Sequence, residues 1–296
     1  MPLPIALVLS AVVLCGWIPS FVSSDWREVL PTLVLAVCSA FLFWWHAIQI
    51  QLIRSRDGLP LFFYLLTVTA FPSFHTSWQG QVAVVCMLLV LRLFQHCFRE
   101  ENPTEQAFLI TLLLLFGSLA MPDMVWLVIV VWLAFMLLRS FGVRVWLATL
   151  IGVAVFAIYF LPLWYFGWVD NPYMALISRK WLFAAVPLWD AVKVVCIIVF
   201  GVGLFVALMF RVDRDSAEQQ AWLLLFMLFF VVCAGWALFP ISVPISVITG
   251  CCGTMLPLLW LMLSGLAVLF FRQRESVVRS VVYMLSIAFL VLCYLV

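Results

Sequence analysis

Long apolar segments alternate along the sequence with short connections that carry charged residues, prolines or glycines. A helix needs about 20 apolar residues to cross the hydrocarbon core of a bilayer. On this criterion the sequence predicts an all-α, polytopic transmembrane bundle of about eleven spans, each bounded to within about three residues. The spans are predicted near residues 3–22, 30–53, 59–74, 79–95, 105–121, 124–140, 144–167, 188–210, 219–238, 242–271 and 277–296.

Positive charge follows the alternation of these connections. Of 15 lysines and arginines, 11 fall on connections that share one side of the membrane, and the other four are Arg27, Arg179, Lys180 and Lys193. Cytoplasmic loops are enriched in lysine and arginine. The N-terminus is therefore predicted to be cytoplasmic and the C-terminus to lie outside. Arg92 and Arg139 are expected to extend toward the inner interface.

The composition argues against a soluble protein. Of 296 residues, 68% are hydrophobic and 9% are charged, whereas soluble domains carry roughly 25% charged residues. Because the predicted spans use nearly the whole length, residues 1–296 are expected to form one membrane domain. The net charge of +2 is too small and too evenly spread to favour a nucleic-acid partner.

The nine cysteines do not form a pattern typical of a metal site. Most of them lie in apolar segments, where a thiol packs as a small apolar group. The sequence contains no CxxC motif and no His/Cys cluster with metal-ligand spacing. Nucleotide-binding and zinc-protease motifs do not occur either. We therefore expect neither a bound metal nor a cofactor.

The first outward turn contains Asp25-Trp26-Arg27-Glu28. On a helical turn the two carboxylates would share one face, where they can act as a base or hold a divalent cation that bridges to a phosphate. A structural alternative is that Asp25 caps the following helix. Asp25 and Glu28 are the candidate catalytic residues. The small residues Val22-Ser23-Ser24 also leave open cleavage of the first span as a signal peptide, although that span begins without positive charge.

Two histidines are further candidates. His46 lies near the cytoplasmic end of the second span, where an imidazole can shuttle a proton, bind a headgroup phosphate or hydrogen-bond a neighbouring helix. His75 lies in an outward turn and faces the same compartment as Asp25. It can join an outer site if the turns converge.

The longest outward connection, near residues 168–187, combines cations with tryptophan. It contains Arg179, Lys180 and Trp181, which suit a lipid phosphate or pyrophosphate at the outer interface. Ordinary interfacial anchoring explains the same residues. Arg179 and Lys180, together with His75, are the candidate lipid- or phosphate-binding residues.

The long apolar run at 242–271 contains several residues that can break or kink a helix. They are Pro244, Gly250, Gly253 and Pro257. A broken membrane helix can mark a transport site, whereas a tilted and kinked structural span is the alternative.

Residues 105–167 contain a series of short motifs. They include Gly117-Ser118-Leu119-Ala120-Met121-Pro122, Leu138-Arg139-Ser140-Phe141-Gly142, Ile151-Gly152 and Tyr159-Phe160-Leu161-Pro162. With the preceding hairpin, this segment resembles an uncharacterised multi-pass family of Bacteroidota envelopes. The resemblance implies a bacterial inner-membrane protein and brings no established activity with it.

The succession of short hairpins and inward arginines is similar, more weakly, to the membrane core of polyprenyl-phosphate-dependent (C-type) glycosyltransferases. That resemblance implies an acidic base in the first outward loop, where Asp25 or Glu28 is the match. Those enzymes are usually much longer, have a larger first outward loop and often carry an outer globular domain.

The sequence leaves three functions open, and with them the question of whether the protein is an enzyme. The first is a non-catalytic subunit or scaffold of a cell-envelope process. The second is a glycosyltransferase-like protein that handles a polyprenyl- or lipid-linked glycan at the outer leaflet, with Asp25 or Glu28 as base. The third is a permease. The expected partners are the lipid bilayer and either other envelope membrane proteins or a lipid-linked glycan.

Overall fold

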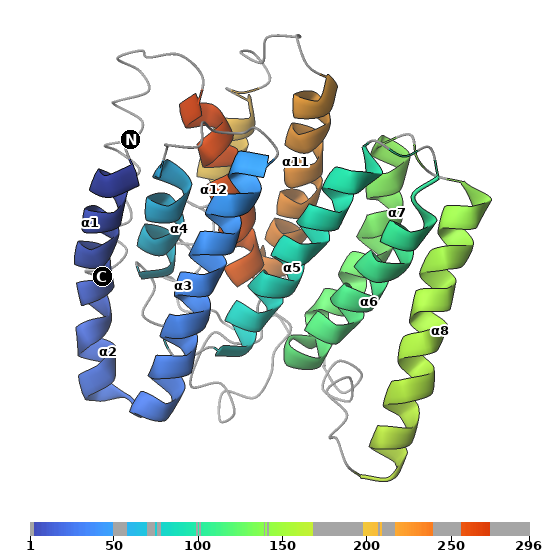
Figure 1. The fold of residues 1–296 in the computed structure, drawn as a ribbon, viewed down its shortest axis with the longest axis horizontal. Coiled ribbons are helices and arrows are strands. Elements are labelled where there is room, and N and C mark those ends of the chain that lie inside the picture. The colour runs from blue at the N-terminus through green and yellow to red at the C-terminus, as the bar shows by residue number, and fades with distance from the viewer. Residues whose placement is uncertain are drawn as a thin grey trace.

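A computed structural model gives the protein a helical fold (Figure 1). It describes residues 3–49, 58–69, 75, 78–98, 100, 102–138, 140, 142–167, 198–206, 208, 217–238 and 256–272. Every regular element in these residues is an α-helix or a short 3-10 helix. The predicted all-α class is confirmed for this part of the chain.

The first predicted span is one nearly continuous helical stretch. It consists of α1 (Leu3–Leu14), the 3-10 turn η1 (Cys15–Trp17) and α2 (Ile18–Ser23). Pro19 is near the start of α2, where its missing N–H cannot continue the regular ladder, so the helix tightens just before it. Helix α3 (Trp26–Gln49) follows after a short turn and begins four residues earlier than the predicted boundary at residue 30.

The next helices agree with the predicted segments to within a few residues. Pro122 starts η3 directly after the extended residue Met121, so the predicted span at 124–140 is a 3-10 turn followed by a helix. These elements are α4 (Leu59–Thr69), α5 (Trp78–Cys97), α6 (Thr104–Ala120), η3 (Pro122–Trp126), α7 (Leu127–Leu137) and α8 (Val143–Tyr165).

The C-terminal part is described only in pieces. Residues 198–206 and 208 are helical, and α11 (Ala217–Leu238) and α12 (Leu256–Arg272) follow. Pro257 is the second described residue of α12, directly after residues that lie outside the described part of the chain. The other predicted helix breakers, Pro244, Gly250 and Gly253, lie outside the described residues, as does the predicted span at 277–296.

Several helices have the length and apolar character that a membrane requires. Four stretches are long and apolar enough to cross one, and they are Pro4–Ser23, Trp26–Gln49, Trp78–Cys97 and Val143–Tyr165. Shorter apolar helices accompany them, including Thr104–Ala120 and Gln220–Gly235. These elements indicate a membrane protein, while the larger number of spans and their orientation stay predictions.

The helices stand side by side in an order that differs from their order in the sequence. In Figure 1, α1, α4, α3, α5, α6 and α8 follow one another across the molecule. Helix α1 packs on α4, α4 on α3 and α12, α3 on α5, α5 on α6 and α12, and α6 on α8. Helix α11 packs on α12 and α7. Helix α5 is therefore central, and α8 is at an edge.

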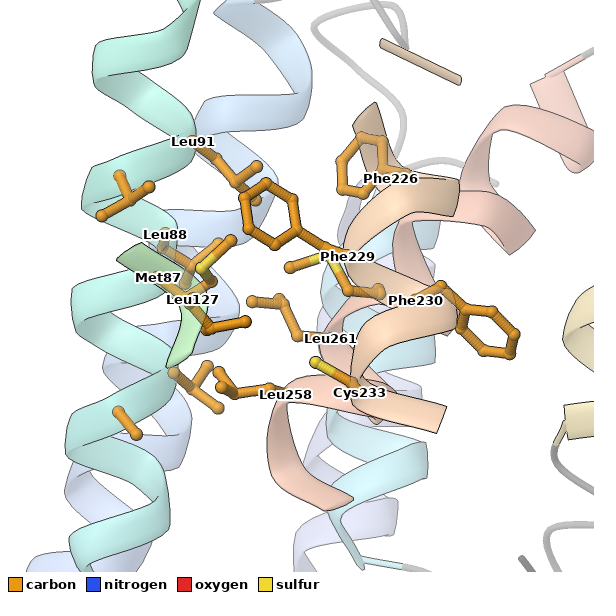
Figure 2. Packing of buried hydrophobic residues seen from close by; sticks show 14 of the residues in the cluster. Met87, Leu88, Leu91, Leu127, Phe226, Phe229, Phe230, Cys233, Leu258 and Leu261 are labelled. Atoms are coloured by element: carbon orange, nitrogen blue, oxygen red, sulfur yellow. The ribbon is translucent and has the colours of Figure 1, made fainter. Parts of the chain in front are cut away.

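The core between α5, α7, α11 and α12 is apolar and rich in leucine and phenylalanine (Figure 2). The Phe94 ring links two helices, since its centroid lies 5.4 Å from that of Phe135 in α7 and 6.2 Å from that of Phe229 in α11. Figure 2 shows the side chains of Met87, Leu88, Leu91, Leu127, Phe226, Phe229, Phe230, Cys233, Leu258 and Leu261.

Two glycines of the motifs at 105–167 are points of close helix contact. A Cβ on Gly117 would lie 2.7 Å from Met124 Sδ, and one on Gly152 would lie 3.1 Å from Thr111 Cβ. Gly117 thus lets η3 approach α6, and Gly152 lets α8 approach α6. The physical role of these motif positions is packing.

Candidate functional site

Asp25 lies in the turn between α2 and α3, and its carboxylate is bound to the backbone of its own helix. Asp25 Oδ1 accepts a hydrogen bond from the Arg27 N–H at 3.0 Å. The Asp25 carbonyl accepts from the Glu28 N–H at 3.0 Å and from the Val29 N–H at 3.2 Å. This is the geometry of an N-cap, in which a side-chain oxygen satisfies an otherwise unpaired N–H of the first turn.

Glu28 is exposed in the first turn of α3, where a carboxylate is favoured by the helix dipole. Beside it, the Arg27 guanidinium lies 5.8 Å from the centroid of the Trp26 ring, so the cation contacts an aromatic face. Among the described residues, no group of three or more His, Cys, Asp or Glu side chains is placed to hold a metal ion.

His75 belongs to a buried group that we call the His75 cluster, formed by Trp17, Ser20, Thr69 and His75. His75 Nδ1 and Ser20 Oγ lie 2.6 Å apart, and the His75 ring stacks on that of Trp17 with centroids 3.9 Å apart. Trp17 Nε1 in turn donates a hydrogen bond to Thr69 Oγ1 at 3.0 Å. The cluster joins η1 and α2 to the end of α4 and to the segment before α5.

Burial controls the protonation of His75. The ring is fully buried, and the loss of water lowers the pKa of His75 from 6.5 to about 4, against a smaller opposing effect of the Thr69 backbone. The imidazole is therefore neutral near pH 7. A neutral ring that stacks on tryptophan and bonds to a serine hydroxyl acts as a packing element.

Three of the predicted outer-site residues, Asp25, Glu28 and His75, lie in the described part of the chain. Asp25 and Glu28 are exposed, whereas His75 is fully buried and has Ser20 and Trp17 as its partners. Arg179 and Lys180 lie outside the described residues. The predicted convergence of His75 with the carboxylates stays a prediction.

A second buried polar group lies at the opposite end of α3, and we call it the His46 cluster. It consists of His46 on α3, Arg92 and Gln95 on α5, and Trp222 on α11. His46 is 3% exposed and Trp222 is fully buried. Their rings meet edge to face, with centroids 5.5 Å apart. Along α3, His46 is about 30 Å from Trp26, at 1.5 Å per residue.

Hydrogen bonds tie Arg92 and Gln95 to the end of α3. Arg92 Nη1 donates to Gln95 Oε1, and Gln95 Nε2 donates to the Gln49 carbonyl at 3.0 Å. Gln49 is three residues beyond His46, one helical turn away. Through Gln95, the Arg92 guanidinium is thus tied to the turn of α3 that follows His46.

Three nitrogens of this cluster are buried without a hydrogen-bond partner. They are Nδ1 and Nε2 of His46 and Nε1 of Trp222. An indole N–H can only donate, a guanidinium can only donate, and a neutral imidazole donates from one nitrogen. The arrangement can therefore bind a group that accepts hydrogen bonds, above all an anion.

His46 is a candidate from the sequence, but its contacts in the cluster were not predicted. Arg92, expected to extend to the interface, also donates to Gln95, and the three-residue spacing of this pair on one helix is the signal that could have shown it. Trp222 carries no comparable signal, because it is one of 15 tryptophans in an apolar chain. Asp123, which was not among the candidate residues, is fully buried at the start of η3.

Comparison with known proteins places the chain in a family. No curated protein and no solved structure matches it. The model of one family matches residues 2–239, a range that contains both histidine clusters and every described element from α1 to α11. Because this range is most of the 296 residues, the chain belongs to that family, DUF6427, a family of unknown function.

Proposed function

We propose that the protein is a non-catalytic subunit or scaffold of a cell-envelope process in the inner membrane of a Bacteroidota bacterium. In this proposal the chain crosses the membrane about eleven times and begins in the cytoplasm. Its apolar helices support a role within the bilayer, and its partners are other envelope membrane proteins.

The structural use of Asp25 is the observation that carries the proposal. A general base must reach a proton of its substrate, whereas the Asp25 carboxylate accepts the Arg27 N–H and caps α3. His75, another candidate residue of the outer site, is buried against Trp17 and Ser20. Both residues thus contribute to the fold in a way that requires no substrate.

The placement of helix ends supports the proposed topology. The last turns of α3 and α5 and the first turns of α11 meet in the His46 cluster. All three ends are predicted to face the cytoplasm from the distribution of lysine and arginine. The His75 cluster collects ends predicted to face outward, where α2 and α4 stop.

The proposal is tested with variants that separate capping from catalysis. Serine caps a helix about as well as aspartate but has no carboxylate base. We expect Asp25→Ser combined with Glu28→Ala to complement a deletion strain fully and to retain the membrane proteins that co-purify with the wild type. Asp25→Ala is the matched variant that also removes the cap.

The glycosyltransferase-like alternative gives the opposite result. If Asp25 or Glu28 acts as a base toward a lipid-linked glycan, the Asp25→Ser, Glu28→Ala protein abolishes complementation while its amount in the membrane stays normal. Failure of the wild type to co-purify with any envelope membrane protein after cross-linking also contradicts a scaffold.

A further inference from the structure

The unpaired nitrogens of the His46 cluster point to a ligand. We propose that this cluster binds a phosphate group, carried by a lipid headgroup or by free phosphate, with Trp222 Nε1, His46 and Arg92 as the binding groups. The inference is independent of the proposed scaffold function, since it concerns the other end of α3 and assigns no chemistry to Asp25 or Glu28.

Leaving these nitrogens unpaired costs free energy of folding. A buried polar group without a partner costs about 1–3 kcal/mol, and most buried polar groups in proteins are satisfied. Two side chains from different helices, His46 and Trp222, carry such nitrogens in contact with each other. A hydrogen-bond acceptor placed between the helices would accept from the Trp222 N–H and from the one N–H of a neutral His46.

The His46 cluster is positively charged and rich in hydrogen-bond donors. Trp222 and Arg92 offer only donors, and Arg92 adds a permanent positive charge. Gln95 holds Arg92 by accepting from Nη1, and Gln95 is held by the Gln49 carbonyl. Gln95 is thus a positioning residue that orders the guanidinium near His46. A phosphate offers several acceptor oxygens and negative charge, which fit a cation accompanied by unpaired N–H donors.

The residues of the His46 cluster lie close to the ends of their helices. His46 lies three residues from the end of α3, Arg92 lies five from the end of α5, and Trp222 lies five from the start of α11. These positions are about 5–8 Å inside the helix ends, at 1.5 Å per residue. In a membrane helix that crosses the hydrocarbon core, this depth is close to the headgroup layer, where lipid phosphates reside.

A buried polar pair between α4 and the first turn of α5 shows what a satisfied site looks like. Tyr64 on α4 donates to Gln81 Oε1 on α5 at 3.2 Å, and both side chains are buried. This pair satisfies the tyrosine hydroxyl within the protein. The His46 cluster differs because its donors outnumber its acceptors.

The test uses the full-length protein in a phosphate-free maltoside detergent. One arm adds inorganic phosphate, a second adds dioleoylphosphatidylglycerol, and a third adds dioleoylglycerol, which has the same chains without phosphate. The thermal midpoint is followed as each probe is titrated, because a ligand that binds the folded state raises it. We expect a rise with phosphatidylglycerol, with inorganic phosphate or with both, and none with dioleoylglycerol.

The variants locate the binding. We expect Trp222→Phe, which keeps the ring and removes the N–H, and Arg92→Gln each to weaken phosphate binding at least about tenfold, which is roughly 1.4 kcal/mol. Trp132→Phe is the matched control, because Trp132 Nε1 donates to Thr149 Oγ1 at 2.9 Å elsewhere in the fold. It should bind like the wild type.

The result identifies the source of the phosphate and can overturn the proposal. A response to inorganic phosphate indicates a free anion, and a response to phosphatidylglycerol alone indicates a headgroup. A wild type that responds to neither probe, or equally to dioleoylglycerol, rules out the site even if the variants fail to fold. Variants that fold and bind like Trp132→Phe also rule it out.

Discussion

The two histidine clusters differ in the partners of their buried imidazole rings. His75 and His46 are 0% and 3% exposed. At His75, Nδ1 is paired with Ser20, Nε2 has no hydrogen-bond partner and the ring stacks on Trp17. At His46, both nitrogens are unpaired and the ring meets the edge of Trp222. Burial alone therefore does not separate a packing histidine from a binding histidine. The partners of the ring separate them.

This difference has a physical consequence for substitution. Removing a hydrogen-bonded side chain leaves its partner buried and unsatisfied, whereas removing an unpaired polar group leaves no partner unsatisfied. The His75 cluster should thus respond to substitution with a loss of stability. The His46 cluster should respond with a loss of binding.

Trp17→Ala should have the largest effect on stability. Trp17 is 1% exposed, stacks on His75 and donates to Thr69, so its removal leaves a cavity and an unpaired hydroxyl. We expect a loss of about 3–5 kcal/mol in the free energy of unfolding, measured by denaturation in detergent. A loss below about 1 kcal/mol would show that the His75 cluster is not a packing unit.

Acidification should destabilise the His75 end. The pKa of His75 is about 4 in the folded protein and 6.5 in the unfolded chain. Because the folded pKa is depressed, the unfolded chain binds the extra proton, and stability is lost as pH falls from about 6.5 to about 4. We expect a loss of about 2–4 kcal/mol over this range, measured as unfolding free energy against pH. His75→Asn, which does not titrate, should remove that part of the slope.

Replacing each histidine with leucine compares the stability of the two clusters directly. His75→Leu leaves Ser20 Oγ without its partner, so we expect a loss of about 1–3 kcal/mol. His46→Leu removes two unpaired nitrogens from a buried position, so its unfolding free energy should be unchanged or higher by about 1 kcal/mol. Both are read from the same denaturation curves. Equal losses at the two sites would contradict the distinction between them.

The cap at the start of α3 should have the smallest effect. Asp25→Ala removes the acceptor of the Arg27 N–H and should cost about 1 kcal/mol in unfolding free energy, while Asp25→Ser should cost only a few tenths. Glu28→Ala, which loses only the interaction with the helix dipole, should cost about 0.5 kcal/mol. If Asp25→Ala is as stable as the wild type, Asp25 does not stabilise α3 as a helix cap.

Much of the fold could be predicted from hydropathy, because lipid demands long apolar helices with satisfied backbones. The predicted segments at 79–95, 105–121 and 144–167 differ from α5, α6 and α8 by one or two residues at each end. The start of α3 was missed by four residues because charged residues at 25–28 mark a turn in hydropathy, whereas Asp25 is a cap and the charges belong to the first helical turn.

The sites were less predictable, since they depend on contacts between distant segments. Ser20 and His75 are 55 residues apart in the sequence, and no periodic pattern links them. The approach of Trp222 to His46 depends on the packing of α11, which hydropathy does not specify. Histidine in an apolar segment is unusual enough to be noticed, but its partners come from the fold.

Helix α3 runs as one continuous helix from the turn that contains Asp25 to the His46 cluster. Its buried face runs through Val29, Thr32, Ala36, Ser39, Phe43 and His46, which recur every three or four residues. Deleting one residue near Cys38 would turn everything beyond it by about 100° and shift it by about 1.5 Å, because each residue adds that rotation and rise. His46 would leave its face while Asp25 kept its place. The length of the helix thus sets how far along its axis the His46 imidazole lies and toward which side it points, and both are needed for its contact with the Trp222 indole.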